Sequence, residues 1–268
     1  MSMKRMLFMV LMLVACISGS AQSEEELWIK NGNRGIFGVL SRPAADGKEK
    51  HPVAIISHGF NGTHWFGKDY FPLMQELGYM CYTFDFPCGS VRSRSDNNTM
   101  NMSAMDEVDD LLAVVKYFQS QPDVDVKHIV LIGESQGGLV SALAAARIPK
   151  EISNVILIYP ALCIPDNWNE RYPTVNAIPD TTRLWNVPMG RSYFEEIRGL
   201  NPYKEIVKYK KPVLIVHGDM DRVVPLSYSQ RAAKVYKKAR LEVIEGAGHG
   251  FKPAERAKAF EYIRVALQ

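Results

Sequence analysis

The stretch from His128 to Val140 constrains the fold of this chain more than any other. Residues 129–132 are all β-branched or leucine, which predicts a fully buried strand, and the alanine- and leucine-rich run after Gly138 predicts a helix. Between them lies Gly133-Glu134-Ser135-Gln136-Gly137. Glycines two residues before and two after the serine let neighbouring backbone come close, so the serine can occupy a strained turn between strand and helix. Its hydroxyl would then stand exposed above the sheet.

Two backbone N–H groups near this serine are predicted to bind an oxyanion. A helix that begins directly after Ser135 offers unpaired N–H groups and a positive dipole end, so we expect one donor from Gln136. The turn His58-Gly59-Phe60 follows another apolar strand, predicted over 52–57, and we assign the second donor to Phe60. His58 itself is interpreted as a packed residue that shapes the turn rather than as a catalytic one.

A serine hydroxyl needs a base within hydrogen-bond reach, and that base needs a partner that fixes its tautomer. Asp221 and His249 each follow a predicted strand, as Ser135 does, and the order serine, acid, histidine is that of hydrolases with such a turn. Because parallel strands place their carboxyl ends at one edge of a sheet, we expect these three residues to meet. Asp219 is the alternative acid. If they do not meet, the segment from Gly133 to Gly137 is only a loop made flexible by its glycines.

The rest of the pattern predicts an α/β fold with a mostly parallel central sheet flanked by helices. The chain has 268 residues, enough for one large α/β domain over 22–268. The segment at about 161–209 interrupts the alternation of strands and helices, because it is long, irregular and rich in proline and aromatic residues. Such a connection is usually a lid or a binding loop, and the alternative is a helical excursion that only covers a sheet edge.

The first 21 residues are predicted to be a signal peptide. Lys4 and Arg5 precede an apolar run over 6–15 and small residues up to Ala21, which is typical of a chain exported to the periplasm or secreted. We favour cleavage after Ala21. The alternative is a lipid anchor at Cys16, because Leu13-Val14-Ala15-Cys16 resembles a bacterial lipoprotein box. No later segment is long enough for a transmembrane helix.

Composition narrows the possible partners. A formal net charge of +3 gives no case for a nucleic-acid partner. The acidic residues over 106–110 are interpreted as the solvent-exposed face of a helix over 104–119, so no metal site and no cofactor is predicted. Cys81, Cys88 and Cys163 are an odd number of cysteines after the leader, so at least one is a free thiol or pairs between chains. The oligomeric state is not indicated.

Several of these motifs together resemble the α/β-hydrolase superfamily, over roughly Leu27 to the C-terminus. A narrower resemblance is to bacterial cinnamoyl or feruloyl esterases. The segments that carry the two resemblances are Gly133–Gly138, His58-Gly59-Phe60, Tyr159-Pro160-Ala161, Ile178-Pro179-Asp180, Gly190-Arg191-Ser192-Tyr193, the acid loop His217–Pro225 and Gly248-His249. Glu134, where that family commonly has histidine, and Pro87-Cys88-Gly89-Ser90, where Gly-x-Gly is usual, depart from the pattern.

The resemblance implies roles that the residues alone do not. In the superfamily the carboxylate three residues before a Val-Pro pair is the triad acid, which corresponds to Asp221. In the esterases the insertion forms a small lid over the acyl pocket, and an aspartate and a tyrosine of the lid contact the phenolic ring of the substrate. These two residues correspond to Asp166 and Tyr193.

We therefore predict a secreted serine esterase that hydrolyses hydroxycinnamoyl (feruloyl-type) or related carboxylic esters through an acyl-enzyme intermediate. Its substrate would be a small-molecule or oligosaccharide ester, as in the degradation of plant cell-wall polysaccharides. One alternative is a broad carboxylesterase, an acyl-peptide hydrolase or a serine peptidase, because a triad is indifferent to the leaving group. Another is a non-catalytic binding module that has kept the fold.

Overall fold

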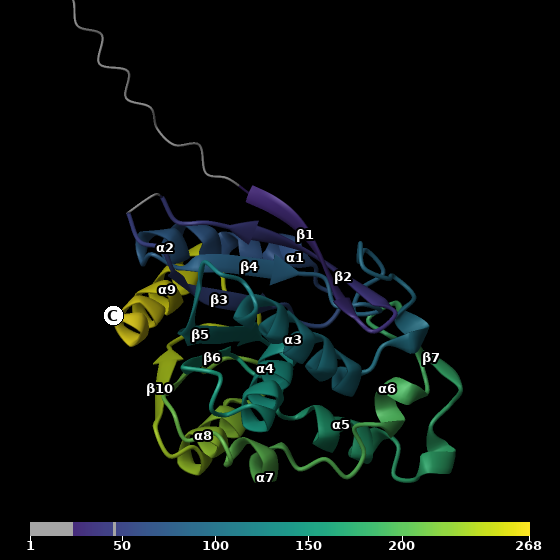
Figure 1. Cartoon of the computed structure of the whole chain (residues 1–268). Helices are drawn as coiled ribbons and strands as arrows, with labels where there is room; N and C mark the ends of the chain where they lie inside the picture. Colours follow the sequence, from purple (N-terminus) through teal and green to yellow (C-terminus); the bar gives the residue numbers. More distant parts are fainter. Residues whose placement is uncertain (1–23, 45–46) are drawn as a thin grey trace, which may run out of the picture.

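The centre of the molecule is a mixed sheet, seen in a computed structural model that describes residues 24–44 and 47–268 (Figure 1). Among these residues, eight strands pair in the order β1-β2-β4-β3-β5-β6-β9-β10. They are β1 (Glu24–Asn31), β2 (Arg34–Ser41), β3 (His51–Ser57), β4 (Met80–Phe84), β5 (Val124–Glu134), β6 (Asn154–Ile158), β9 (Val213–Gly218) and β10 (Ala239–Ile244). The β1–β2 and β2–β4 pairs are antiparallel and the others are parallel. The predicted fold class is confirmed.

Helices cover both faces of this sheet because its inner strands are apolar on both sides. In β5, Ile129 and Leu131 belong to one buried cluster, while Val130 and Ile132 belong to the other. This alternation is the period of two that a strand imposes on its side chains. The first cluster packs against α3 (Ala104–Gln119), α4 (Gln136–Arg147), α7 (Pro202–Ile206) and α8 (Leu226–Val235), and the second against α2 (Phe71–Glu76) and α9 (Pro253–Leu267). The short helix α1 (His64–Gly67) precedes α2.

Helix α3 begins as predicted, because the Ser103 hydroxyl accepts hydrogen bonds from two backbone N–H groups of its first turn. The interpretation of all its acidic residues as solvent-exposed is wrong. Glu107 and Asp110 are buried, the first against Gln136 and the second against Arg34. Their partners come from α4 and from the first residue of β2, which are distant in the sequence.

The insertion between β6 and β9 is more regular than the sequence indicated. It contains α5 (Ile164–Arg171), the two-stranded hairpin β7 (Thr181–Leu184) and β8 (Val187–Gly190), α6 (Ser192–Glu195) and then α7. The two residues between β7 and β8, Trp185 and Asn186, both have positive φ, as a tight hairpin turn of type I′ requires. A small apolar cluster built around Met189, Tyr193 and Phe194 gives the insertion a core of its own.

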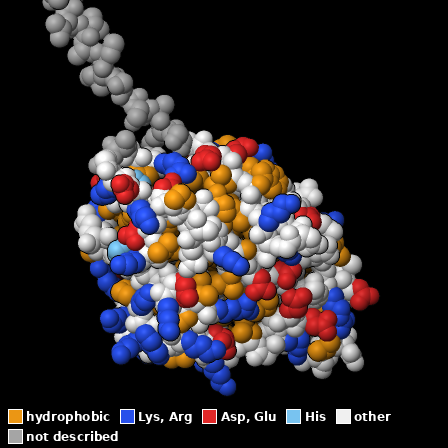
Figure 2. Space-filling model, in the orientation of Figure 1, with side chains coloured by type: hydrophobic (Ala, Val, Ile, Leu, Met, Phe, Trp, Pro, Cys, Tyr) orange, Lys and Arg blue, Asp and Glu red, His pale blue; other side chains and the backbone are white. Residues whose placement is uncertain are grey.

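The predicted signal peptide and Cys16 lie outside the described residues. No helix in the described part of the chain has the length and apolar character needed to cross a membrane. On the face drawn in Figure 2, apolar side chains alternate with charged ones, and Lys and Arg gather over the part of the molecule that carries α8 and β10. Positively charged side chains are therefore unevenly distributed over this face.

Candidate active site

Ser135 occupies the predicted strained turn between β5 and α4. Its φ of 52° lies in the left-handed region, which non-glycine residues rarely adopt. A Cβ atom on Gly133 would come within 2.2 Å of the Gly137 carbonyl oxygen, and one on Gly137 within 2.3 Å of the Ser57 carbonyl oxygen. Both flanking glycines are therefore required for β5, α4 and the end of β3 to approach this closely.

The structure brings Ser135, His249 and Asp221 together in one hydrogen-bonded chain. The Ser135 Oγ lies 3.0 Å from His249 Nε2, and His249 Nδ1 lies 2.8 Å from Asp221 Oδ2. With the proton on Nδ1 donated to the carboxylate, Nε2 carries a lone pair that can accept the serine proton. The three residues follow β5, β10 and β9, so the common edge of the parallel strands sets this geometry.

The carboxylate of Asp221 is held in its ionised form. Burial alone would raise its pKa, but hydrogen bonds from His217, from His249 and from the Val224 N–H outweigh burial and lower the pKa well below the ordinary range of an aspartate. Oδ1 accepts the N–H groups of Val223 and Val224, both at 2.8 Å. The site therefore contains an anion that faces the Nδ1 side of the imidazole.

His217 is a supporting residue that the sequence did not single out. It is fully buried, with Nε2 3.3 Å from Asp221 Oδ2 and 3.0 Å from the Val224 carbonyl oxygen, and with Nδ1 2.7 Å from the Ser229 hydroxyl. The sequence signal was its place at the end of β9, four residues before the acid. A histidine after a strand is too common a feature to assign without its contacts.

Asp219, the alternative acid, does not contact the imidazole. Its Oδ1 accepts the N–H of Gly246 at 2.6 Å, and Met220 N–H donates to the Ala247 carbonyl oxygen. These bonds tie the β9 loop to the β10 loop that carries His249. Asp219 therefore shapes the loop and Asp221 meets the histidine.

The two residues predicted to supply the oxyanion donors, Phe60 and Gln136, line one cavity together with Ser135. As the first residue of α4, Gln136 has a backbone N–H that the helix itself does not use. The turn that carries Phe60 lies against the strand-to-helix turn at Ser135, which we call the elbow (Gly133–Gly137). A Cβ on Gly59 would lie 3.1 Å from the Ser135 Cβ. His58 is buried in this turn, and its Nε2 accepts the Phe86 N–H at 3.1 Å. Burial lowers the pKa of His58, which is the packed histidine that the sequence indicated.

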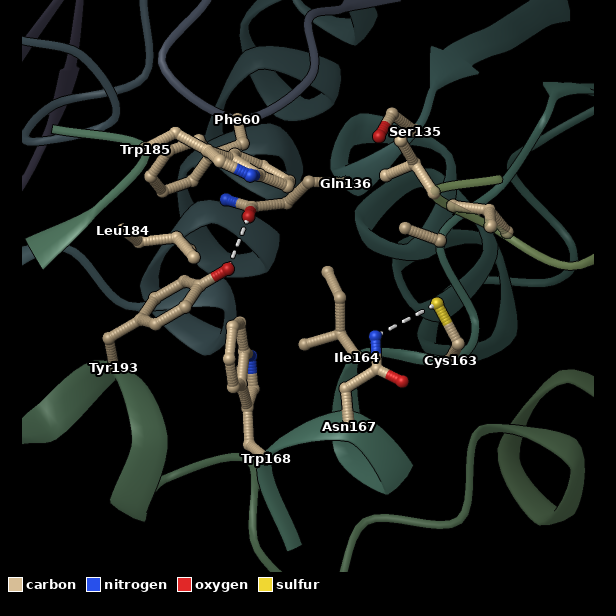
Figure 3. Close-up of a pocket in the computed structure, with 13 residues that line it drawn as sticks. Phe60, Ser135, Gln136, Cys163, Ile164, Asn167, Trp168, Leu184, Trp185 and Tyr193 are labelled. Carbon is tan, nitrogen blue, oxygen red and sulfur yellow. Dashed lines mark hydrogen bonds between the residues drawn. The ribbon is translucent and has the colours of Figure 1, made fainter. Parts of the chain in front are cut away.

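A cavity of about 90 Å³ opens at Ser135 and is mostly apolar. Figure 3 shows Phe60 and Trp185 on one side of it and Trp168 and Tyr193 on the other. Most of its walls come from the insertion. The remaining lining residues are Ser135, Gln136, Ala161, Cys163, Ile164, Asn167, Leu184, Val223 and Val224.

A second, wider cleft of about 390 Å³ meets the first at the serine. Both are lined by Phe60, Ser135, Trp185 and Val223, and the wider one also contains His249. The hydroxyl of Ser135 thus lies between a narrow aromatic cavity and an open cleft. This arrangement can hold the two sides of an ester in separate spaces next to the nucleophile.

The two predicted lid residues differ in their placement. Tyr193 lines the narrow cavity, and its buried hydroxyl donates to Gln136 Oε1 at 2.7 Å (Figure 3). Asp166 is exposed, does not line the cavity and accepts a hydrogen bond from the Tyr228 hydroxyl at 3.0 Å. The predicted contact of Asp166 with a substrate ring does not fit this position, because α5 turns its neighbours Asn167 and Trp168 toward the cavity instead.

The cysteines and acidic residues form no further reactive centre in the described part of the chain. Cys81, Cys88 and Cys163 are buried and free, and burial raises the pKa of all three thiols. Among the residues described, no group of three or more His, Cys, Asp or Glu side chains is arranged to hold a metal ion.

Known proteins with similar sequences include peptidases and lipases. The chain is 25% identical over 251 residues to the uncharacterized peptidase YuxL of Bacillus subtilis, an alignment that covers 85% of this chain and 36% of YuxL. It is 23% identical over 195 residues to the monoacylglycerol lipase ABHD6 of Homo sapiens, covering 72% of this chain and 53% of that protein. The chain thus spans about a third of YuxL and about half of ABHD6.

Among solved structures, Est1E from Butyrivibrio proteoclasticus with ferulic acid bound is similar over its whole length. Its TM-score is 0.78 at 27% sequence identity, and the match covers 90% of this chain and 99% of that chain. The resemblance to α/β hydrolases is thereby confirmed. The family model of the prolyl oligopeptidase family matches residues 65–265, which include the elbow, the acid loop and the histidine loop. The chain belongs to the prolyl oligopeptidase family and has the α/β-hydrolase fold.

Proposed function

We propose that this protein is a serine esterase in which Ser135 is the nucleophile, His249 the general base and acid, and Asp221 the residue that orients the histidine. The observation that carries the proposal is the hydrogen-bonded chain of these three residues at the meeting point of the two cavities. The N–H groups of Phe60 and Gln136 complete the site as donors to the oxyanion.

The proposed reaction has two half-reactions. His249 Nε2 takes the proton of Ser135 as Oγ attacks the ester carbonyl carbon, and the carbonyl oxygen becomes an oxyanion that Phe60 and Gln136 stabilise. The intermediate collapses, the bond to the alcohol oxygen breaks, and that oxygen takes the proton from His249. Water then attacks the acyl-enzyme with His249 as base, which releases the carboxylic acid and restores Ser135.

We infer that the acyl group is aromatic, of the hydroxycinnamoyl type. The narrow cavity is lined by Phe60, Trp168, Trp185 and Tyr193, and such rings favour a flat aromatic group. The similarity to Est1E, whose structure contains ferulic acid, supports the same class of ligand. The alcohol would occupy the wider cleft, which is open enough for a sugar or another bulky leaving group.

A peptidase activity is the second candidate, favoured by the family match and by the similarity to YuxL. A panel of methyl ferulate, p-nitrophenyl acetate and a chromogenic peptide separates the two. We expect the highest kcat/KM on methyl ferulate. Turnover of the peptide alone would replace the esterase proposal, and equal rates on the two esters would indicate a broad carboxylesterase.

A fluorophosphonate probe tests the nucleophile independently of the substrate. We expect covalent labelling of the wild-type protein at Ser135 and none in Ser135→Ala, whose kcat should also fall by roughly 10⁴-fold or more. Folded wild-type protein that takes up no label and hydrolyses no ester would be a binding module rather than an enzyme.

A further inference from the structure

Tyr159 packs against the catalytic imidazole proposed above. The centroids of the Tyr159 and His249 rings are 4.7 Å apart, with the planes tilted by 54°, and the Tyr159 ring meets Phe251 edge-on at 4.8 Å. Tyr159 is 2% exposed and follows β6, the strand between those that precede Ser135 and Asp221. Its ring thus contacts the histidine at the edge of the sheet where the reaction would occur.

The backbone of Tyr159 is strained. Its φ of 35° lies in the left-handed region, where glycine is favoured and a bulky side chain is rare. The Tyr159 N–H donates to the Val216 carbonyl oxygen at 2.8 Å, which anchors this conformation between β6 and β9. A large aromatic residue in a backbone conformation that favours glycine points to a use for the side chain.

The Tyr159 hydroxyl is held by a buried carboxylate. It donates to Glu134, which also accepts the Tyr70 hydroxyl at 2.5 Å and an Arg256 N–H at 3.0 Å. Glu134 directly precedes Ser135, and Arg256 lies in α9, just after the loop of His249. The Glu134 carboxylate therefore links the residue after β6 to α9, the helix that follows the loop of His249. It belongs to the residue directly before Ser135.

The histidine loop needs such support because glycines surround His249. Gly246 and Gly250 both have positive φ, and Gly248 directly precedes the histidine. Glycine backbone is conformationally free, so the loop alone determines the orientation of the imidazole only weakly. A misplacement of about 1 Å in such a site can cost roughly 10²-fold in rate.

We propose that Tyr159 is a positioning residue for His249, held in place by Glu134 and Arg256. The ring fixes the rotation of the imidazole, so that Nε2 reaches Ser135 while Nδ1 reaches Asp221. It also lies within cation–π range of the imidazolium that forms when His249 accepts the serine proton. This inference rests on the proposed esterase function.

The test compares Tyr159→Leu, which removes the ring, with Tyr159→Phe, which keeps it. We expect the leucine variant to lower kcat on methyl ferulate by roughly 30- to 300-fold with KM changed less than about threefold, and phenylalanine to restore kcat to within about fivefold of wild type. The rate of fluorophosphonate labelling at Ser135 should fall in parallel. Tyr209→Leu is the matched control, because it removes a buried tyrosine ring that lines neither cavity, and it should leave kcat unchanged.

Each outcome bears on a different claim. Wild-type protein that neither labels nor turns over an ester would end the proposed function, whereas normal rates in folded Tyr159→Leu would overturn only the positioning role. A phenylalanine variant as slow as the leucine variant would also overturn it, because the hydroxyl bond to Glu134, and not the ring contact with His249, would then determine the rate. If Tyr159→Leu does not fold, Tyr159→Met gives the same comparison with a flexible side chain.

Discussion

At Asp221, each carboxylate oxygen has a different set of partners. Oδ1 accepts two backbone N–H groups of its own loop, and Oδ2 accepts His249 Nδ1. The backbone of the loop therefore holds the carboxylate through Oδ1, and Oδ2 accepts the Nδ1 proton that defines the histidine tautomer. The carboxylate of Asp219, two residues earlier in the same loop, accepts the Gly246 N–H and lies outside this chain of bonds.

We expect Asp221→Asn to lower kcat on methyl ferulate by roughly 10³- to 10⁴-fold, because an amide nitrogen in place of Oδ2 favours the wrong imidazole tautomer. Asp219→Asn should cost less than about fivefold, since its partner is a backbone N–H away from the imidazole. Steady-state kinetics on both variants, with circular dichroism to show that they fold, make the comparison. A larger loss in folded Asp219→Asn would reverse the assignment of the acid.

At the scale of elements, α3 and α4 are joined by polar side chains inside the protein. Gln136 Nε2 donates to both carboxylate oxygens of Glu107, and Gln136 Oε1 accepts the Tyr193 hydroxyl. The first residue of α4 is thereby connected to α3 on one side and to the insertion on the other. The same insertion supplies the aromatic walls of the narrow cavity.

Glu107 should make the stability of the protein depend on pH. Burial raises its pKa from 4.5 to about 8, so between these values the folded state holds a proton that the unfolded state has lost. The free energy of unfolding should therefore fall as pH rises across this range. In Glu107→Gln we expect the fall between about pH 5 and about pH 9 to be smaller by roughly 2–4 kcal/mol. Urea unfolding at both pH values measures it, and identical pH slopes in the two proteins would contradict the prediction.

Helix α5 provides a matched pair of substitutions in the insertion. Trp168→Ala should lower kcat/KM for methyl ferulate by roughly 10- to 100-fold, because it removes an aromatic wall, while p-nitrophenyl acetate hydrolysis changes less than about threefold. Asp166→Ala, on another side of the helix, should change neither rate. Equal losses of Trp168→Ala on both substrates would mean damage to the fold rather than to the acyl subsite.

At the scale of the whole molecule, the sheet supplies the site with its geometry. β3, β5, β6, β9 and β10 are parallel neighbours, and Phe60, Ser135, Tyr159, Asp221 and His249 follow them in the same order. Residues more than a hundred positions apart therefore lie within hydrogen-bond distance at one edge.

We propose that the mature protein begins at Gln22 and is exported. A chain expressed from Gln22 should fold and show the same kcat/KM as the protein recovered after export, because every described strand and helix lies after Gln22. Mass spectrometry of the protein recovered after export identifies the N-terminus. A lipid-modified fragment that begins at Cys16, found in the membrane fraction, would contradict cleavage after Ala21.

The sequence alone was enough for features whose cause is local. The elbow glycines around Ser135, the apolar runs of the strands and the helix over 104–119 depend on interactions over a few residues, so their patterns are visible in order along the chain. The order of serine, acid and histidine also predicted which residues meet, because parallel strands align their carboxyl ends.

Only the tertiary structure decided which side chains face one another across the sheet. The burial of Glu107, the support of Asp221 by His217 and the contact of Tyr159 with His249 each join residues from different elements. Asp166 shows the same limit, because the rotation of α5 and not the identity of the residue turned Trp168 toward the cavity. Local pattern determines that a helix forms, whereas packing against the rest of the molecule determines which face of it meets the site.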